Sequence, residues 1–309
     1  MHAIFSMSPD RTDEPRTPSE KDLLRSLRKK LARRAAAHAA APRAPGDAIV
    51  YRRDLPQATP RPSQAGRLCH QSSGICIPLA SCVAGREMPA AAGAPFYLVE
   101  SDPAAEAAIA VELAAALPRA LAALPRDDAP PLAPEDACFL DVETTGLGTA
   151  VVFLIGTLAW REGRLVCRQL LARSYAEEAS ILDAFAQQAR GTRLLVTFNG
   201  KTFDVPSLRA RAATARVVLP DPPRHLDLLH PARRRFGHTM PDCRLQTLER
   251  IVCRRHRVDD IAGADIGRAY HDFVRTGDAR ELALIVKHNR QDLLTLAELM
   301  ARILLAHDE

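Results

Sequence analysis

Two acidic residues lie two positions apart in a segment that otherwise reads as a buried strand, FLDVETTGL at residues 139–147. Side chains alternate between the two faces of a strand, so Asp141 and Glu143 are expected to point the same way. Like charges so close together repel, and burying them is costly unless a positive charge lies between them. The spacing therefore indicates a cation site.

Two later segments carry further residues that could join this pair. Asp204 follows the strand-like LLVTF and the turn Asn199-Gly200, at the expected start of a helix, where the helix dipole alone would also favour an acid. His288 and Asp292 lie four residues apart in KHNRQDLLTL, so they share one face of a predicted helix. Each of these two segments alone can be explained by ordinary helix structure. The three acidic segments together, in this order along the chain, indicate a common site.

The elements that would position these residues begin near residue 137. Strands are predicted at FLDVE, VVFLIGTLAW, RLVCRQLL, LLVTF and HLDLL, with the turn REGR between the second and the third. Helices are predicted over AEEASILDAFAQQA and FDVPSLRARAA, and through the remainder to residue 305. Strands that come first and then alternate with helices predict an α/β domain with a mixed sheet covered by helices.

Six segments, FLDVETTGL, FLIGTL, LVTFNGKTFDVPSL, HLDLLHPARR, CRLQTLE and HNRQDLLTL, resemble in this order the YprB-like branch of the DEDD exonuclease superfamily. The resemblance covers about residues 137–305 and implies a ribonuclease H-like fold with a mixed five-stranded sheet flanked by helices. It further implies that Asp141, Glu143, Asp204 and Asp292 hold two Mg²⁺ or Mn²⁺ ions, for which hard oxygen ligands are suited. By similarity, Asp141 would bridge the ions and Asp204 would act through water in a two-metal hydrolysis.

His288 departs from the better-known patterns of that superfamily, which place Tyr four residues, or His five residues, before the last acid. The spacing of four still directs His288 toward the site of Asp292. An imidazole ordinarily titrates near a pKa of about 6.5, which suits proton transfer at neutral pH. We therefore predict that His288 positions or deprotonates the attacking water.

Candidate contacts to nucleic acid flank these acids. ETTGL could present backbone N–H groups and the Thr145 hydroxyl to a terminal nucleotide, although a plain strand-ending turn explains it equally well. Arginine is dense and lysine absent between residues 209 and 257; guanidinium groups suit phosphate, but an arginine-rich genome would give the same surface. The aromatic residues Phe153, Trp160, Phe198 and Phe203 lie in apolar patterns that predict core packing, with nucleotide stacking as the alternative for Phe203. The candidate set is Thr144, Thr145, Gly146, Asn199, Lys201, Phe203, Arg233, Arg234, Arg235 and Arg244.

The first 133 residues carry no comparable motif. Residues 1–45 are predicted to be a less ordered, polar and basic tail with a short amphipathic helix in KDLLRSLRKKLARRAAAHAA. Residues 46–133 read as an accessory region rich in Ala and Pro that ends in a linker, with a strand at FYLVE and a helix over 104–123. The exonuclease domain would take residues 134–309. Cys69, His70, Cys76 and Cys82 cluster in the accessory region, but their spacing matches no standard zinc site, and incidental thiols are the alternative.

Composition bounds the class of protein. The 309 residues are 47% hydrophobic and 26% charged with a net charge of +5, which is ordinary for a soluble globular protein. The N-terminus makes a poor signal peptide, and the apolar stretch AAIAVELAAALPRALAAL is interrupted by Glu112 and Pro118, so no membrane span is predicted. Seven scattered cysteines fit a reducing compartment. We expect a cytoplasmic protein.

The predicted cation site together with the resemblance implies a metal-dependent 3′–5′ exonuclease acting on a single strand or 3′ end, with DNA favoured over RNA. The resemblance adds a role in DNA repair and a DNA helicase as the protein partner. Two alternatives stay open: a catalytically silent nucleic-acid-binding or scaffold module on the same fold, and a structure-selective endonuclease. Clustered acids argue against the silent module, because they repel phosphate and would weaken nucleic-acid binding in a domain that only binds.

Overall fold

The computed structural model describes residues 76–91, 93–103, 108–124, 130–148 and 150–305, all within the compact unit Pro62–Glu309. The basic helix expected within residues 1–45, and Cys69 and His70 of the cysteine cluster, lie outside the described residues. Cys76 and Cys82 are half-buried near the two ends of a short helix, and incidental thiols stay the favoured interpretation of the cysteine cluster. Over the described ranges, no helix combines the length and the hydropathy that crossing a membrane requires.

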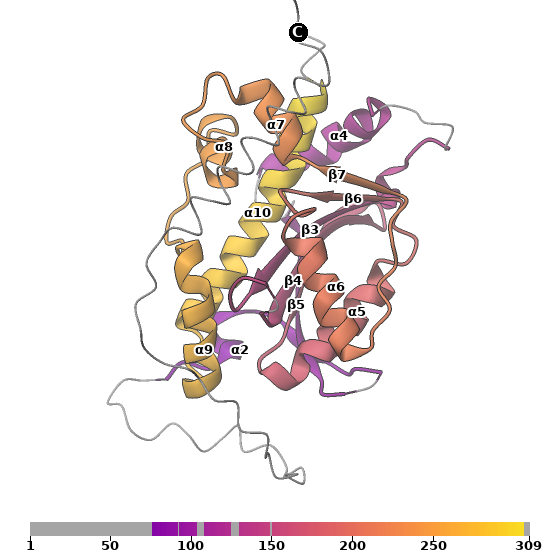
Figure 1. Ribbon diagram of the computed structural model, residues 1–309. Coiled ribbons are helices and arrows are strands. Elements are labelled where there is room, and N and C mark those ends of the chain that lie inside the picture. Colours follow the sequence, from indigo (N-terminus) through magenta and orange to yellow (C-terminus); the bar gives the residue numbers. More distant parts are fainter. Residues whose placement is uncertain (1–75, 92, 104–107, 125–129, 149, 306–309) are drawn as a thin grey trace, which may run out of the picture. The chain divides into compact units, whose positions relative to one another are not determined.

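The described strands form one mixed sheet of seven, in the order β1-β2-β5-β4-β3-β6-β7 (Figure 1). Neighbouring strands from β1 to β3 in this order are antiparallel, whereas β6 runs parallel to β3 and β7 runs parallel to β6. The β4–β5 turn places Glu162 and Gly163 at φ angles of 50° and 78°, as a two-residue hairpin requires. The strands are β1 (Arg86–Met88), β2 (Phe96–Ser101), β3 (Ala137–Thr144), β4 (Val152–Arg161), β5 (Arg164–Leu171), β6 (Leu194–Thr197) and β7 (Arg224–Asp227).

Helices cover both faces of the sheet. Figure 1 shows α5 and α6 on one face and the long α10 crossing the other. Alternate residues of β3 pack into these two layers: Leu140 is buried with Ile181 of α5, and Phe139 with Leu293 of α10. The helices are α2 (Leu79–Cys82), α4 (Ala108–Ala122), α5 (Glu178–Gln188), α6 (Asp204–Ala215), α7 (Leu229–Phe236), α8 (Leu245–Ile251), α9 (Ile266–Thr276) and α10 (Arg280–Leu305).

The sheet has two more strands than the five expected. FYLVE was expected as a strand of the accessory region, and it pairs antiparallel with β5 as β2. Pairing satisfies the backbone groups of β5, which would otherwise form an open sheet edge. β1 pairs with β2 and spans only three residues, which are too few for an alternating pattern of apolar and polar residues to predict a strand. The α/β ribonuclease H-like class is confirmed, the strand count was wrong, and the domain boundary expected at residue 134 stays a prediction.

Candidate active site

β3 carries the first two acids on the face that α10 covers. Ala137 and Phe139 belong to the same alternating set and are buried in the cluster that includes Leu293 of α10. Asp141 and Glu143 continue that row toward the end of the strand. Glu143 is buried, at 8% exposure, and Asp141 is partly exposed. The apolar first half of β3 therefore fixes the direction in which both carboxylates point.

A tight turn between β6 and α6 positions Asp204. Asn199 takes the left-handed conformation, with a φ of 62°, and a Cβ on Gly200 would lie 2.5 Å from a β6 side chain. The carboxylate of Asp227, at the end of β7, accepts hydrogen bonds from the backbone N–H groups of Asn199 and Lys201 at 2.7 and 3.1 Å. The sequence Asn-Gly thus permits the turn, and Asp227 holds it.

Direct contacts bring α6 and α10 to the acids of β3. Oδ1 of Asp204 accepts a hydrogen bond from the backbone N–H of Val142 at 3.2 Å. α10 packs along β3, and the side-chain amide of Asn289 donates to Oδ2 of Asp141 at 2.7 Å. Asp292 lies three residues further along α10, one turn of helix away. The four predicted acids therefore form one cluster built from β3, α6 and α10.

Burial and mutual repulsion disfavour the charged forms of three of these acids. Burial raises the pKa of Asp141 above its ordinary value, and the negative charges of Asp292, Glu143 and Asp204 raise it further. Burial likewise raises the pKa of Glu143 to about 8 and the pKa of Asp204 to about 7. A nearby cation would favour the charged form of each of these carboxylates.

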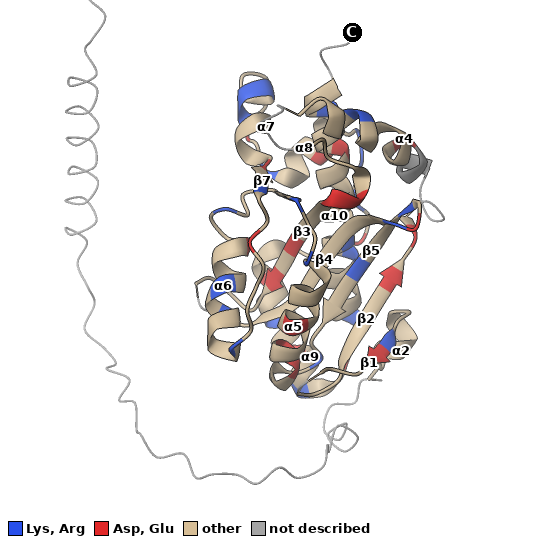
Figure 2. Ribbon diagram, turned by 90° about the vertical axis from the view of Figure 1, so that its right-hand side faces the viewer, with Lys and Arg blue, Asp and Glu red and all other residues tan. Residues whose placement is uncertain are grey.

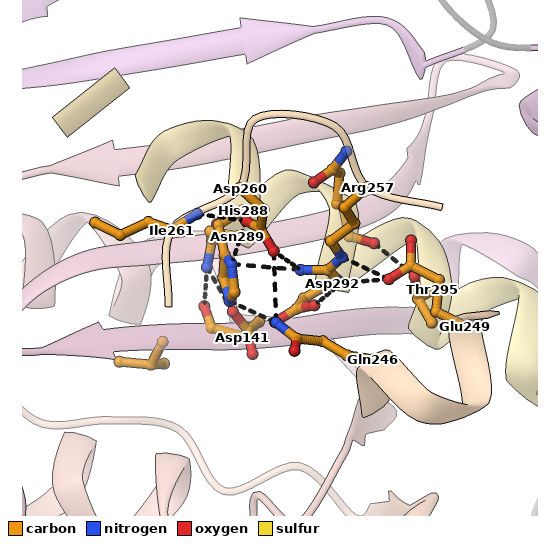
Figure 3. A network of polar contacts seen from close by, with 12 residues as sticks. Asp141, Gln246, Glu249, Arg257, Asp260, Ile261, His288, Asn289, Asp292 and Thr295 are labelled. Carbon is orange, nitrogen blue, oxygen red and sulfur yellow. Dashed lines mark hydrogen bonds and ion pairs between the residues drawn. The ribbon is translucent and has the colours of Figure 1, made fainter. Parts of the chain in front are cut away.

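Asp292 differs from the other three acids because it already has cationic neighbours (Figure 3). Arg257, in the segment after α8, forms ion pairs with Asp292, with Glu249 at 2.5 Å and with Asp260 at 3.4 Å. Its side chain is only 8% exposed. Burial raises the pKa of Asp292, but the hydrogen bond with His288 and the charge of Arg257 outweigh burial and lower it. Asp292 is therefore charged at neutral pH.

His288 lies between two carboxylates and is buried. Its Nδ1 is 2.7 Å from Oδ1 of Asp260, and its Nε2 is 3.4 Å from Oδ2 of Asp292. Burial disfavours the charged imidazole, but Asp292, Glu143 and Asp260 outweigh burial and raise the pKa of His288 to about 9. A charged imidazole donates hydrogen bonds but cannot take a proton. A charged His288 can position a water molecule by donating a hydrogen bond, as predicted. To act as the predicted general base, His288 would first have to lose its proton.

The donor set fits a hard divalent cation in its chemistry. Asp141, Glu143 and Asp204 offer carboxylate oxygens, the ligands that Mg²⁺ and Mn²⁺ prefer. Within the described residues, however, no three His, Cys, Asp or Glu side chains are already arranged to hold an ion. Arg257 engages the fourth acid, Asp292. A four-acid metal site would therefore require Asp292 to bind the ion through the oxygen lone pairs that its contacts with Arg257 and His288 leave free, or to release one of these contacts.

The predicted nucleotide contacts at the end of β3 and in the loop that follows border a cavity of about 720 Å³, which residues of α9 also line. Thr144, Thr145 and Gly146 all lie on its wall. The Thr144 hydroxyl donates to the carbonyl of Gly146 at 2.6 Å, and the Thr145 hydroxyl accepts from the N–H of Val151 at 3.1 Å. Both hydroxyls thus help to close the loop, and the second bond uses the Thr145 oxygen only as an acceptor.

The turn before α6 presents two more of the predicted contacts. Lys201 is exposed, and Phe203 is 49% exposed. The core packing predicted for Phe203 is therefore wrong, because this residue belongs to the turn, outside the apolar faces of β6 and α6. Phe153 is fully buried and stacks on Tyr270 with ring centroids 4.0 Å apart. Trp160 and Phe198 pack against the core as predicted.

The arginines predicted to bind phosphate are spread over α7 and the start of α8. Arg233, Arg234 and Arg235 are exposed in the last turns of α7, and Figure 2 shows the Lys/Arg colour over part of this helix. Arg235 borders a cavity of about 390 Å³ together with Glu298 of α10, which lies about 9 Å beyond Asp292 along the helix axis. Arg244 precedes α8 with its side chain 85% exposed. Phosphate binding by these side chains stays a prediction.

The sequence interpretation missed Arg257, Asp260 and Asn289. Asn289 falls at a spacing of four between Ile285 and Leu293, so it is a polar residue on the buried stripe of α10. That anomaly could have revealed it. Arg257 and Asp260 follow α8 in a segment without helical or strand periodicity, and no local pattern singles them out.

Residues 138–304, more than half of the chain, match the family model described as the RNase_H superfamily. The chain therefore belongs to the RNase H superfamily, and its fold is of the nuclease type. The uncharacterized protein YprB of Bacillus subtilis (strain 168) is 34% identical over 166 residues, which cover 52% of this chain and 40% of that protein. The chain thus spans about two fifths of the length of this relative.

Among solved structures, the family B DNA polymerase of the hyperthermophilic archaeon Pyrobaculum calidifontis matches with a TM-score of 0.44. The two are 16% identical, over 55% of this chain and 24% of the polymerase chain.

Proposed function

We propose that the protein is a divalent-metal-dependent nuclease that acts as a 3′–5′ exonuclease, with DNA as the favoured substrate. The observation that carries this proposal is the cluster of four carboxylates from β3, α6 and α10, three of which have raised pKa values. Acids so placed are costly to the fold and repel phosphate. They become useful when a bound cation turns the cluster into a site for phosphodiesters.

Mg²⁺ or Mn²⁺ would lower the pKa of an attacking water and offset the charge that develops on the leaving 3′ oxygen. Asp141, Glu143, Asp204 and Asp292 would hold two such ions through their oxygens. His288, charged between Asp260 and Asp292, would orient the water by hydrogen bonding. Water adds to phosphorus as the bond from phosphorus to the 3′ oxygen breaks. That oxygen takes a proton, so each turnover releases one 5′-nucleotide and leaves a new 3′ hydroxyl.

The cavity beside β3 supports a place for the terminal nucleotide. Thr144, Thr145 and Gly146 border it, and exposed Lys201 and Phe203 of the other loop offer a charge and a stacking surface. The arginines of α7 and Arg244 would follow the phosphates of the strand behind that nucleotide. DNA repair, a helicase partner and a cytoplasmic location remain expectations from the resemblance and the composition.

Cleavage of a 5′-labelled single-stranded oligonucleotide tests the proposal. Purified full-chain protein would be incubated with Mg²⁺, Mn²⁺ or EDTA, beside the Asp204→Asn variant, which keeps an acceptor for the Val142 N–H but loses the charge. We expect a ladder that shortens from the 3′ end, absent with EDTA and in the variant. Binding without cleavage of DNA, RNA or duplex forms would instead favour the silent module.

A closed circular single strand separates the exonuclease from the endonuclease alternative. A circle has no 3′ end, so an exonuclease leaves it intact while it degrades the linear form of the same sequence. Linearisation of the circle would favour the endonuclease. An RNA oligonucleotide of matched sequence, assayed in parallel, measures the preference for DNA.

A further inference from the structure

A buried row of polar side chains runs from the middle of the sheet to the active site. Asp141, Gly156 and Gln169 face one another on the adjacent strands β3, β4 and β5. α10 places Asn289 over Gly156, and both amide side chains are buried, Asn289 at 0% and Gln169 at 1% exposure. A Cβ on Gly156 would lie 2.0 Å from Oδ1 of Asn289, so only glycine leaves room for this amide. Figure 3 shows Asn289 pointing at Asp141.

Two backbone carbonyls fix which end of the Asn289 amide faces Asp141. The carbonyl of Val286 accepts from Nε2 of Gln169 at 2.7 Å, so Gln169 must present its NH₂ group there. The same NH₂ group donates to Oδ1 of Asn289 at 2.9 Å. Nδ2 of Asn289 then donates to the backbone carbonyl of Asp141 at 3.2 Å and to its carboxylate Oδ2 at 2.7 Å. Because carbonyls only accept, neither amide can turn over without losing hydrogen bonds.

The orientation of the two amides allows Asn289 to donate to Asp141 but leaves one buried oxygen of Gln169 without a partner. Oε1 of Gln169 is buried and has no hydrogen-bond partner among the described residues, which is unfavourable for a buried acceptor. The folded chain leaves this acceptor unpaired and keeps all four N–H donations of the two amides. The contact with Asn289 also lowers the pKa of Asp141 against the larger effect of burial, so it favours the charged carboxylate.

We propose that Asn289 is a positioning residue of the active site: it orients the Asp141 carboxylate for a divalent cation, and Gln169 and Gly156 hold Asn289 in place. The inference rests on the proposed nuclease function. Side chains that hydrogen-bond a metal ligand fix its direction and typically change metal affinity by about 10–100-fold when removed. Oδ2 of Asp141 still has a lone pair after accepting from Asn289, so the contact orients the ligand without occupying it.

Mn²⁺ binding, followed by electron paramagnetic resonance on the full chain, tests this role apart from catalysis. Asn289→Leu removes the donor, Asn289→Ser is a smaller change that shortens the reach to Asp141, and Gly156→Ala displaces the amide without altering it. The control is Thr157→Val, which removes a buried hydroxyl from the neighbouring position on β4, where side chains point to the opposite face. Thermal unfolding in EDTA reports the stability of each variant.

We expect the Mn²⁺ dissociation constant to rise about 10–100-fold in Asn289→Leu, Asn289→Ser and Gly156→Ala, with no change in Thr157→Val. Raising the Mn²⁺ concentration should recover most of the cleavage rate. Folded Asn289 variants that bind Mn²⁺ like the wild type, whatever their stability, would overturn the positioning role and leave the proposed function standing. A wild-type protein that neither binds Mn²⁺ nor cleaves any nucleic acid would overturn both.

Discussion

Replacing Arg257 with methionine probes the charge balance of the acid cluster most directly. Methionine keeps an apolar stem of similar length and removes the guanidinium. Arg257 is 8% exposed and forms ion pairs with Glu249, Asp260 and Asp292, whose side chains are 4%, 19% and 13% exposed. Its removal therefore leaves three largely buried carboxylates without their common partner.

The expected loss of stability follows from that geometry. Breaking a buried ion pair by removing one partner costs about 3–5 kcal/mol. Glu249 keeps Arg255 at 3.8 Å, and Asp292 keeps His288 at 3.4 Å. We therefore expect the lower end, a decrease of about 3 kcal/mol in the free energy of unfolding in EDTA at neutral pH. Urea titration measures this value, and Arg250→Met, on the exposed face of α8, serves as control with a change within about 0.5 kcal/mol.

A divalent cation should reduce the difference in the free energy of unfolding between Arg257→Met and the wild type. Because Arg257 and a metal ion would both neutralise Asp292, the variant should gain more from Mg²⁺ than the wild type does. Saturation at about 100 times the dissociation constant stabilises a folded protein by about 2.7 kcal/mol. A loss below about 1 kcal/mol in EDTA would refute the account of Arg257 as a buried counter-charge. An equal gain from Mg²⁺ in both proteins would refute its competition with the metal.

Three further outcomes are expected. In EDTA, the unfolding temperature should fall as pH rises from about 4 to 9. In the folded protein the pKa is about 8 for Glu143, about 7 for Asp204 and about 9 for His288, so these groups hold protons that the unfolded chain releases at lower pH. An unfolding temperature that does not change with pH would contradict these pKa shifts. His288→Ala should slow cleavage by about 10²-fold, because the attacking water loses the donor that orients it, and full activity from about pH 6 to 9 would exclude His288 from orienting the water. Replacing Arg233, Arg234 and Arg235 together with alanine should weaken nucleic-acid binding and flatten its salt dependence; an unchanged salt slope would remove them from the substrate path.

Local patterns were enough to locate the main elements and the acids. Strands β3 to β6 each carry a short apolar run bounded by turn residues, and α5 and α6 carry helical periodicity, so their type and order follow from neighbouring residues. Asp141 and Glu143 were placed on one face because alternation within a strand is a local property. Asp204 and Asp292 were joined to them through the order of the motifs, and the structure brings both to β3.

The tertiary structure alone decided what surrounds those acids. Asn289 meets Asp141 across 148 residues of chain, and Arg257 meets Asp292 across 35, so no window of sequence contains both partners. The pairing of β2 with β5 likewise joins segments that are 68 residues apart at Glu100 and Arg168. The sequence by itself determined which residues could form strands, helices and a carboxylate site, because those properties depend on near neighbours. Which donors and counter-charges reach each carboxylate depends on how the packed helices approach the sheet, and only the folded chain determines that.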